Sequence, residues 1–239
     1  MSAKKSSAAL GSLGLRVVRL YAGLTGFGVS LALLIRARLG LDPWDVLHQG
    51  IARHLGVPIG WVVIGISGVV LLAWIPLRQR PGFGTVSNAV VVGLVTDQAM
   101  ELIAAPRPLA ARLAMLAAAI LVNAASTACY IGAGLGPGPR DGLMTGLAAR
   151  GHSIRATRTA VEVTVLVIGV ILGGSVGIGT VVYAVSIGPL VHVFLPSAKE
   201  NSETATARRE RAHLRIRGHR SGGTGQNGRS TRLRLRVRV

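Results

Sequence analysis

Apolar residues occur along this chain in blocks that approach the length of a membrane-spanning helix. Such a helix needs about 20 mostly apolar residues. Six segments come close to that length: residues 15–35, 59–77, 86–105, 110–131, 159–175 and 180–195. Glycine is frequent inside them, and small residues let helix backbones pack closely in lipid. The pattern therefore predicts an all-α, polytopic membrane helix bundle with about six transmembrane helices.

Two connections between these segments are longer than a simple turn. They cover residues 36–58 and 132–158, and each contains a proline followed two residues later by an aspartate, Asp45 in one and Asp141 in the other. Proline suits the first position of a helix, and an acid in the first turn suits the positive end of the helix dipole. Each connection is therefore expected to hold one short interfacial or re-entrant helix that does not cross the bilayer.

The apolar part of the chain contains an internal repeat. Residues 40–53 align with 136–149 at an offset of 96, with six of 14 positions identical, and 82–93 align with 177–188 at an offset of 95, with seven of 12 identical. Two blocks in the same order at nearly the same offset define a unit of three spans. Because three is odd, the second copy would be inverted in the membrane, as in many secondary transporters. The repeats are expected over 15–105 and 110–196.

Charge separates this apolar body from the end of the chain. The chain is half hydrophobic, yet Lys plus Arg number 27 against nine Asp plus Glu, a formal net charge of +18. This combination argues against an ordinary soluble enzyme and against a wholly disordered protein. Basic residues concentrate on one side of the predicted spans, which places both termini in the cytoplasm of a multi-pass protein of the cell (inner, cytoplasmic) membrane.

The two terminal segments carry part of this charge. Residues 1–14 are expected to form a cytoplasmic N-terminal tail. Residues 197–239 have a net charge of +9 and cannot bury a core, so they are expected to form a disordered basic cytoplasmic tail that contacts anionic lipid. They contain no recognised nucleic-acid-binding module, and no nucleic-acid partner is expected.

Ionisable side chains inside apolar segments are candidates for function because they are costly to place in lipid. Asp97 lies near the centre of the third segment and aligns with His192 in the sixth at the 95-residue offset. Such a pair is suited to relaying protons or binding a cation. Arg140 lies beside Asp141 in a glycine-rich stretch and is the best candidate for binding an anionic group.

Other polar residues complete the set. Glu162 follows Arg158 by four residues, the spacing of an intrahelical ion pair, and Asn123 belongs to a polar cluster in the fourth segment. The candidates for binding a substrate or ion are Asp45, Asp97, Asn123, Arg140, Asp141, Arg158, Glu162 and His192.

Enzymatic motifs are not recognisable in the chain. H-E-x-x-H, G-x-S-x-G and the phosphate-loop pattern are absent, and Cys129 is the single cysteine. We therefore expect no enzyme activity, no catalytic residue, no cofactor and no metal.

Several blocks are similar to one family of bacterial membrane proteins. GLGPGPRDGLMTGLAAR and LGGSVGIGTVVYAVSIGPLV in the second repeat, with LGLDPWDVLHQGI in the first, resemble the YczE/YyaS/YitT family, in particular its YczE-like branch. The resemblance covers about 15–195. It implies an integral membrane protein and assigns no catalytic residue.

Two functions are compatible with these observations. The first is a small-solute transporter with its site at the interface of the repeats. The second is a non-transporting membrane scaffold or accessory protein, in which the repeat serves packing alone. The two hypotheses differ at Asp97, Arg140 and Glu162, which should converge on a cavity in a transporter and pair locally in a scaffold. The solute remains unidentified, and self-association into a homo-oligomer stays open.

Overall fold

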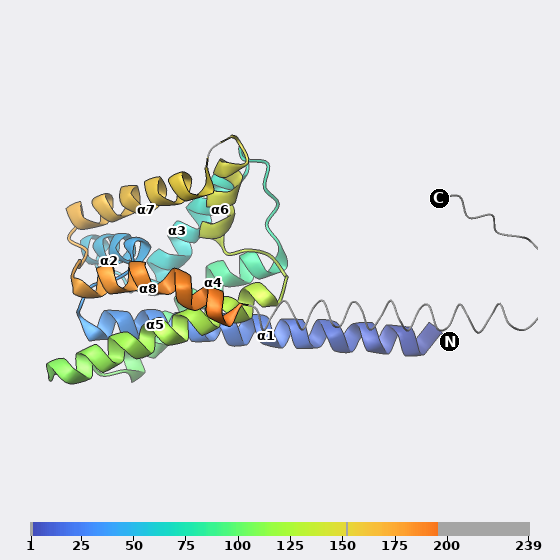
Figure 1. The fold of residues 1–239 in the computed structure, drawn as a ribbon, viewed down its shortest axis with the longest axis horizontal. Helices are drawn as coiled ribbons and strands as arrows, with labels where there is room; N and C mark the ends of the chain where they lie inside the picture. The colour runs from blue at the N-terminus through green and yellow to red at the C-terminus, as the bar shows by residue number, and fades with distance from the viewer. Residues whose placement is uncertain (1, 152, 196–239) are drawn as a thin grey trace, which may run out of the picture. The chain divides into compact units, whose positions relative to one another are not determined.

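The chain folds into α-helices throughout the part that the structure describes. The computed structural model describes residues 2–151 and 153–195, and the expected basic tail at 197–239 lies outside these ranges. The eight helices are α1 (Ser2–Ala37), α2 (Pro43–Leu55), α3 (Ile59–Trp74), α4 (Phe83–Leu102), α5 (Leu109–Gly132), α6 (Pro139–Ala148), α7 (Ile154–Ile171) and α8 (Ile178–Phe194), shown in Figure 1. The prediction of an all-α fold is confirmed for these residues.

Six of the helices correspond to the six predicted apolar segments, with shifted ends. α1 begins at Ser2 and so extends through the segment predicted as an N-terminal tail, where no proline interrupts it. α4 and α7 also begin earlier than predicted, at Phe83 and Ile154. Hydropathy marks the apolar stretch of a helix, whereas its first residue depends on local capping.

Two of these helices are long and apolar enough to cross a membrane alone. They are α1, over Leu13–Ala37, and α5, over Leu109–Gly132, and the pair α2 and α3 together would form one broken span bent by 116°. α8 is apolar but shorter, at 17 residues. The described helices thus give two or three spans by length and composition, and the full set of six spans stays a prediction.

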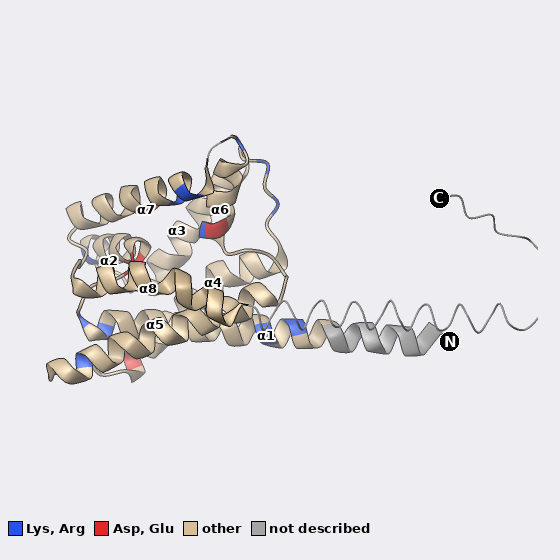
Figure 2. Ribbon diagram, in the orientation of Figure 1, with Lys and Arg blue, Asp and Glu red and all other residues tan. Residues whose placement is uncertain are grey.

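The outer surface of the helices is consistent with a lipid environment. Leu72 on α3 and Val185 on α8 are 64% and 70% exposed, and further large apolar side chains are exposed along the same helices. Along the coloured part of the ribbon in Figure 2, most helical residues are neither acidic nor basic. So many exposed large apolar side chains are unusual in a soluble monomer. They are expected where lipid tails surround the protein.

The two longest helices pack directly against each other. α1 and α5 lie side by side (Figure 1), and glycine permits their close approach. A Cβ atom on Gly23 of α1 would lie 2.7 Å from the backbone nitrogen of Tyr130 on α5. Small residues at such contacts let helices associate in lipid, where burying apolar surface gives no advantage.

The two predicted short helices are confirmed as α2 and α6. α2 begins at Pro43, and the preceding Asp42 accepts a hydrogen bond from the backbone N–H of Asp45 at 2.7 Å, which caps the helix. α6 begins at Pro139, with Asp141 in its first turn. Their starts position the charged side chains described below.

The two halves of the chain make matching contacts at the ends of α1 and α5. Arg16 donates from Nε to the carbonyl oxygen of Ala133 at 2.7 Å. Arg112, 96 residues later, donates from Nε to the carbonyl oxygen of Ala37 at 2.8 Å. Each cation therefore binds the carbonyl end of the other long helix, where the helix dipole favours positive charge.

The starts of α4 and α8 also have matching partners. Gly84 donates its backbone N–H to the carbonyl oxygen of Leu135 at 2.8 Å, and Gly179 donates to that of Leu39 at 2.7 Å. The donors are 95 residues apart and the acceptors 96. In each case the start of a helix in one half is bound by the loop before the short helix of the other half.

Candidate functional site

A cavity of about 340 Å³ lies among the helices. Residues from all eight helices line it. This volume is at the lower end of the range of small-molecule sites, roughly 300–1,000 Å³. The lining includes charged or titratable side chains and aromatic ones: Asp42, Arg140, Asp141, Arg158, Glu162 and His192, with Phe27, Trp44, Tyr130 and Tyr183. The cavity therefore combines apolar faces with a few convergent polar groups, the usual composition of a ligand site.

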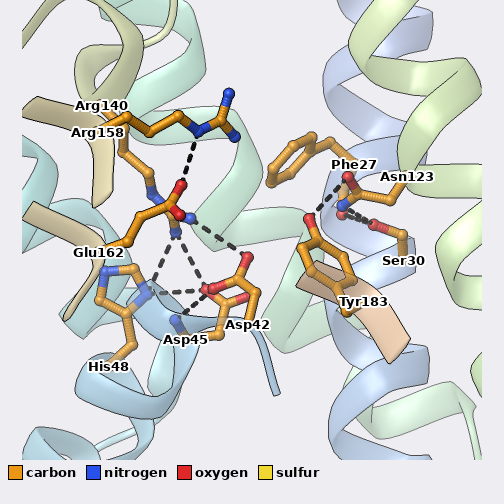
Figure 3. A network of polar contacts seen from close by, with 10 residues as sticks. All are labelled: Phe27, Ser30, Asp42, Asp45, His48, Asn123, Arg140, Arg158, Glu162 and Tyr183. Atoms are coloured by element: carbon orange, nitrogen blue, oxygen red, sulfur yellow. Dashed lines mark hydrogen bonds and ion pairs between the residues drawn. The ribbon is translucent and has the colours of Figure 1, made fainter. Parts of the chain in front are cut away.

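Arg140 at the start of α6 connects the two halves of the chain. Its guanidinium lies 3.1 Å from Asp45 Oδ1 and 3.5 Å from Asp42 Oδ2, at the start of α2. The guanidinium also lies over the Trp44 ring, with Cζ 5.2 Å from the ring centroid. Both carboxylates are almost fully buried. Arg140 thus joins α6 to α2 by a buried ion network, drawn in Figure 3.

The charge of Arg140 is retained in this environment. Burial opposes the charged form, but the neighbouring carboxylates of Asp45 and Asp42 outweigh it and raise the pKa of Arg140 above its ordinary value. Arg140 was predicted to bind an anionic group, and in the structure its guanidinium contacts two carboxyl groups of the protein itself. Asp45, also a predicted residue, lies beside Arg140.

His48 extends the network and was not predicted. Its Nδ1 lies 3.1 Å from Asp45 Oδ1 and 3.5 Å from an Arg140 nitrogen, and the ring is 1% exposed. The spacing of Asp45 and His48, three residues apart on one helix, places them on one face and was a signal for this contact. Asp42 was missed too, although its position before Pro43 is typical of a helix N-cap.

Asp141 and Glu162 have different partners. Asp141 Oδ2 accepts a hydrogen bond from the Tyr130 hydroxyl at 2.9 Å, and among the described residues no Lys or Arg nitrogen lies within ion-pair distance of it. Glu162 Oε1 lies 2.8 Å from Arg158 Nε, which confirms the predicted intrahelical pair.

The opposite side of the cavity is aromatic and neutral. Tyr183 on α8 donates its hydroxyl hydrogen bond to Asn123 Oδ1 at 3.1 Å, and Asn123 Nδ2 donates to Ser30 Oγ at 2.8 Å. Phe27 packs edge-on against Tyr130, with ring centroids 6.3 Å apart. Figure 3 shows Phe27 and Tyr183 facing the charged side chains across the site. The predicted polar residue Asn123 thus orients an aromatic side chain.

Asp97 does not reach this cavity. Its Oδ1 accepts a hydrogen bond from the backbone N–H of Gly60 at 2.7 Å, at the start of α3. The first N–H groups of a helix lack intrahelical partners, so a carboxylate beside them is stabilised. Asp97 forms no hydrogen bond or ion pair with His192 among the described contacts, and of the two only His192 lines the cavity.

The structure thus brings most of the predicted residues together. Those that line the cavity are Asn123, Arg140, Asp141, Arg158, Glu162 and His192. Asp45 pairs with Arg140, and Asp97 caps α3 instead. Of the residues that were to separate a transporter from a scaffold, Arg140 and Glu162 converge on the cavity, while Asp97 pairs locally.

Comparison with known proteins identifies a family. Residues 14–196 match DUF6198, a family of unknown function. An uncharacterized protein of Haemophilus influenzae is 42% identical over 173 residues, which cover 72% of this chain and 79% of the relative. The uncharacterized membrane protein YczE of Bacillus subtilis is 30% identical over 204 residues, covering 84% and 94%.

The same comparison gives one further relative. YyaS of Bacillus subtilis, an uncharacterized protein, is 28% identical over 182 residues, covering 73% of this chain and 89% of the relative. No solved structure matches the chain. The match over most of the helical body, together with the membrane-type fold, shows that the chain belongs to the YczE/YyaS-like family, DUF6198.

Proposed function

We propose that this protein is a small-solute transporter with two inverted three-helix repeats and a solute site in the cavity between them. The observation that carries the proposal is the buried ion network across the cavity wall. It joins Arg140 of the second repeat to Asp42 and Asp45 of the first. A solute in the cavity would touch both repeats at once, as alternating access requires.

The matching contacts of the two halves support the inverted repeat. Arg16 and Arg112 bind equivalent carbonyl groups, and Gly84 and Gly179 bind equivalent loops, in each case across the two halves. Reciprocal contacts are expected when two copies of one unit are related by a two-fold axis. With three spans in each unit, that axis lies in the plane of the membrane, and both termini lie in the cytoplasm.

The burial of the network favours transport over a scaffold. Removing ions from water costs several kcal/mol per ion, and apolar residues of similar volume often stabilise a fold equally well. A scaffold has no need for such a group at a cavity, whereas a transporter can use it to bind solute and to couple two conformations. Arg140, Asp42 and Asp45 join α6 and α2, so separating these short helices would open the wall between the repeats.

Uptake by proteoliposomes tests the proposal. Purified protein is reconstituted, and accumulation of isotope-labelled small metabolites from a mixed extract is compared with empty liposomes. We expect Arg140→Gln to lower accumulation by about tenfold or more, because two buried carboxylates lose their cation. The matched control is Arg107→Gln, at an exposed residue of the loop between α4 and α5, which should leave uptake unchanged.

Arg140→Lys separates a binding defect from misfolding. Lysine keeps the positive charge but lacks the planar fork that reaches both carboxylates, so it should fold and transport at an intermediate rate. No accumulation by the wild-type protein, with correctly inserted and monodisperse material, would favour the scaffold. Equal uptake by wild type and both Arg140 variants would remove the network from the mechanism.

A further inference from the structure

The charges around the cavity do not balance. The carboxylates at the site are Asp42, Asp45, Asp141 and Glu162, and the guanidinium groups are Arg140 and Arg158. The carboxyl groups thus outnumber the guanidinium groups by four to two, although burial raises the pKa of Asp42 to about 6 and also raises the pKa of Asp45. Uncompensated charge in an apolar surrounding is costly, so the cavity favours a positively charged occupant.

Asp141 is the carboxylate most available to such an occupant. Arg140 is engaged by Asp42 and Asp45, and Arg158 by Glu162. Asp141 has the Tyr130 hydroxyl as a hydrogen-bond donor at 2.9 Å, and no cation within 4.0 Å among the residues described. A carboxylate has about four acceptor positions, so most of those on Asp141 stay open to a ligand.

The side of the cavity facing these charges suits a cation as well. Aromatic residues make up only 4% of the chain, yet Phe27, Trp44, Tyr130 and Tyr183 line this cavity. The face of Trp44 is occupied by the guanidinium of Arg140, which leaves Phe27, Tyr130 and Tyr183 for a ligand. Aromatic faces attract cations by about 0.5–2 kcal/mol, and cages of them bind quaternary ammonium groups.

The chemistry of the cavity lining argues for an organic cation rather than a metal ion. The described residues contain no group of three His, Cys, Asp or Glu side chains arranged to hold a metal ion. The rings of Phe27, Tyr130 and Tyr183 line the cavity, and aromatic faces bind a diffuse charge better than a small hydrated ion.

We infer that the cavity binds a small organic cation, an ammonium compound whose charge lies between Asp141 and the rings of Phe27, Tyr130 and Tyr183. This inference deepens the proposed function, because it assigns a chemical class to the solute of the same cavity. The volume of about 340 Å³ is at the lower end of the range of small-molecule sites and leaves room for such a cation.

Direct binding to the purified protein in nanodiscs tests the inference without requiring transport. The probes are choline, ethanolamine and tetramethylammonium, and the reference is 3,3-dimethyl-1-butanol, the uncharged compound of the same shape as choline. By isothermal titration calorimetry, we expect at least one of the cations to bind about tenfold or more tightly than the reference. Equal or absent binding of all three cations would overturn the inference and leave protons as the compensating charge.

Two pairs of variants locate the site. Asp141→Asn should weaken cation binding by about tenfold or more, whereas Glu101→Gln, at an exposed residue of α4 that does not line the cavity, should not. Phe27→Leu should weaken binding by about 3- to 30-fold, whereas Phe194→Leu, at the exposed end of α8, should not. If Asp141→Asn fails to fold, the Phe27 pair and the comparison with the uncharged reference still decide the result.

The binding and uptake assays separate the two proposals. If the cations bind in the Asp141-dependent manner and proteoliposomes accumulate no solute, the transporter proposal fails and the cation site stands. If proteoliposomes accumulate only anionic or uncharged solutes, the cation inference fails and the transporter proposal stands.

Discussion

At the scale of single residues, the site depends on how closely two helices approach. A Cβ atom on Gly142 of α6 would lie 2.0 Å from the Trp74 ring of α3. The same tryptophan donates its indole N–H to the carbonyl oxygen of Pro139 at 3.1 Å. These two contacts hold the start of α6 against α3 and thereby fix the position of Arg140.

Substituting Gly142 should therefore affect both stability and binding. We expect Gly142→Ala to destabilise the protein by about 1–3 kcal/mol, because the added methyl group overlaps a rigid ring. Thermal unfolding in detergent, with the loss of monodisperse protein as the readout, measures this as a lower melting temperature. Gly65→Ala on α3 is the control: its Cβ would meet no atom within 4 Å, and alanine favours the helix. Equal melting temperatures for the two variants would contradict the role given to Gly142.

The sequence predicted contacts between residues correctly where both residues lie on one helix and their charges and spacing determine the contact. The pair of Arg158 with Glu162 follows from a four-residue spacing on one helix. Asp97 shows the limit, because its partner, the N–H of Gly60, lies 37 residues earlier on another helix. The sequence places Asp97 at a depth along α4 but does not say which helix packs beside it. For the same reason it did not reveal that Arg140 meets Asp42 and Asp45.

At the scale of helices, α4 and α8 start with the same capping contact. Gly82 donates its backbone N–H to Thr85 Oγ1 at 3.2 Å, and Gly177 donates to Thr180 Oγ1 at 3.3 Å. Thr85 also donates to the carbonyl oxygen of Pro137 at 2.7 Å. The buried hydroxyl of Thr85 thus forms hydrogen bonds both with the backbone at the start of its own helix and with a loop of the other half of the chain.

Removing this hydroxyl tests whether the cap stabilises the fold. Thr85→Val keeps the shape but leaves the Pro137 carbonyl and the Gly82 N–H unsatisfied, so we expect a loss of about 1–3 kcal/mol. Thermal unfolding in detergent is the measurement. Thr164→Val serves as the control, since Thr164 is exposed on α7 and bonds only within its own helix. A melting temperature as high for Thr85→Val as for the control would exclude a stabilising cap.

The helices themselves were largely predictable from the sequence, including both short ones. Hydropathy marked the six apolar segments, and a proline with an aspartate two residues later marked α2 and α6. The starts of α4 and α7 were placed too late, because Phe83 and the stretch from Ile154 precede the most apolar residues. Capping by Thr85 acts through a contact that hydropathy does not measure.

At the scale of the whole molecule, the proposed inverted repeat predicts on which side of the membrane each connection between helices lies. Val57 follows α2 and Ser153 precedes α7; both are exposed, and they are 96 residues apart, so they occupy equivalent places in the two repeats. If an axis in the membrane plane relates the repeats, these two positions lie on opposite sides of the bilayer. With parallel repeats they would lie on the same side.

Single cysteines decide between these arrangements. Val57→Cys and Ser153→Cys are each introduced into a Cys129→Ala protein, which removes the single native cysteine. A membrane-impermeant maleimide is added to right-side-out and to inside-out vesicles. If the N-terminus lies in the cytoplasm, as the charge distribution predicts, Val57→Cys should react in right-side-out vesicles and Ser153→Cys in inside-out ones. Labelling of both positions from one side would reject the inverted repeat and, with it, a solute site between two opposed halves. The ion network of Arg140 would then stabilise the fold without a part in alternating access.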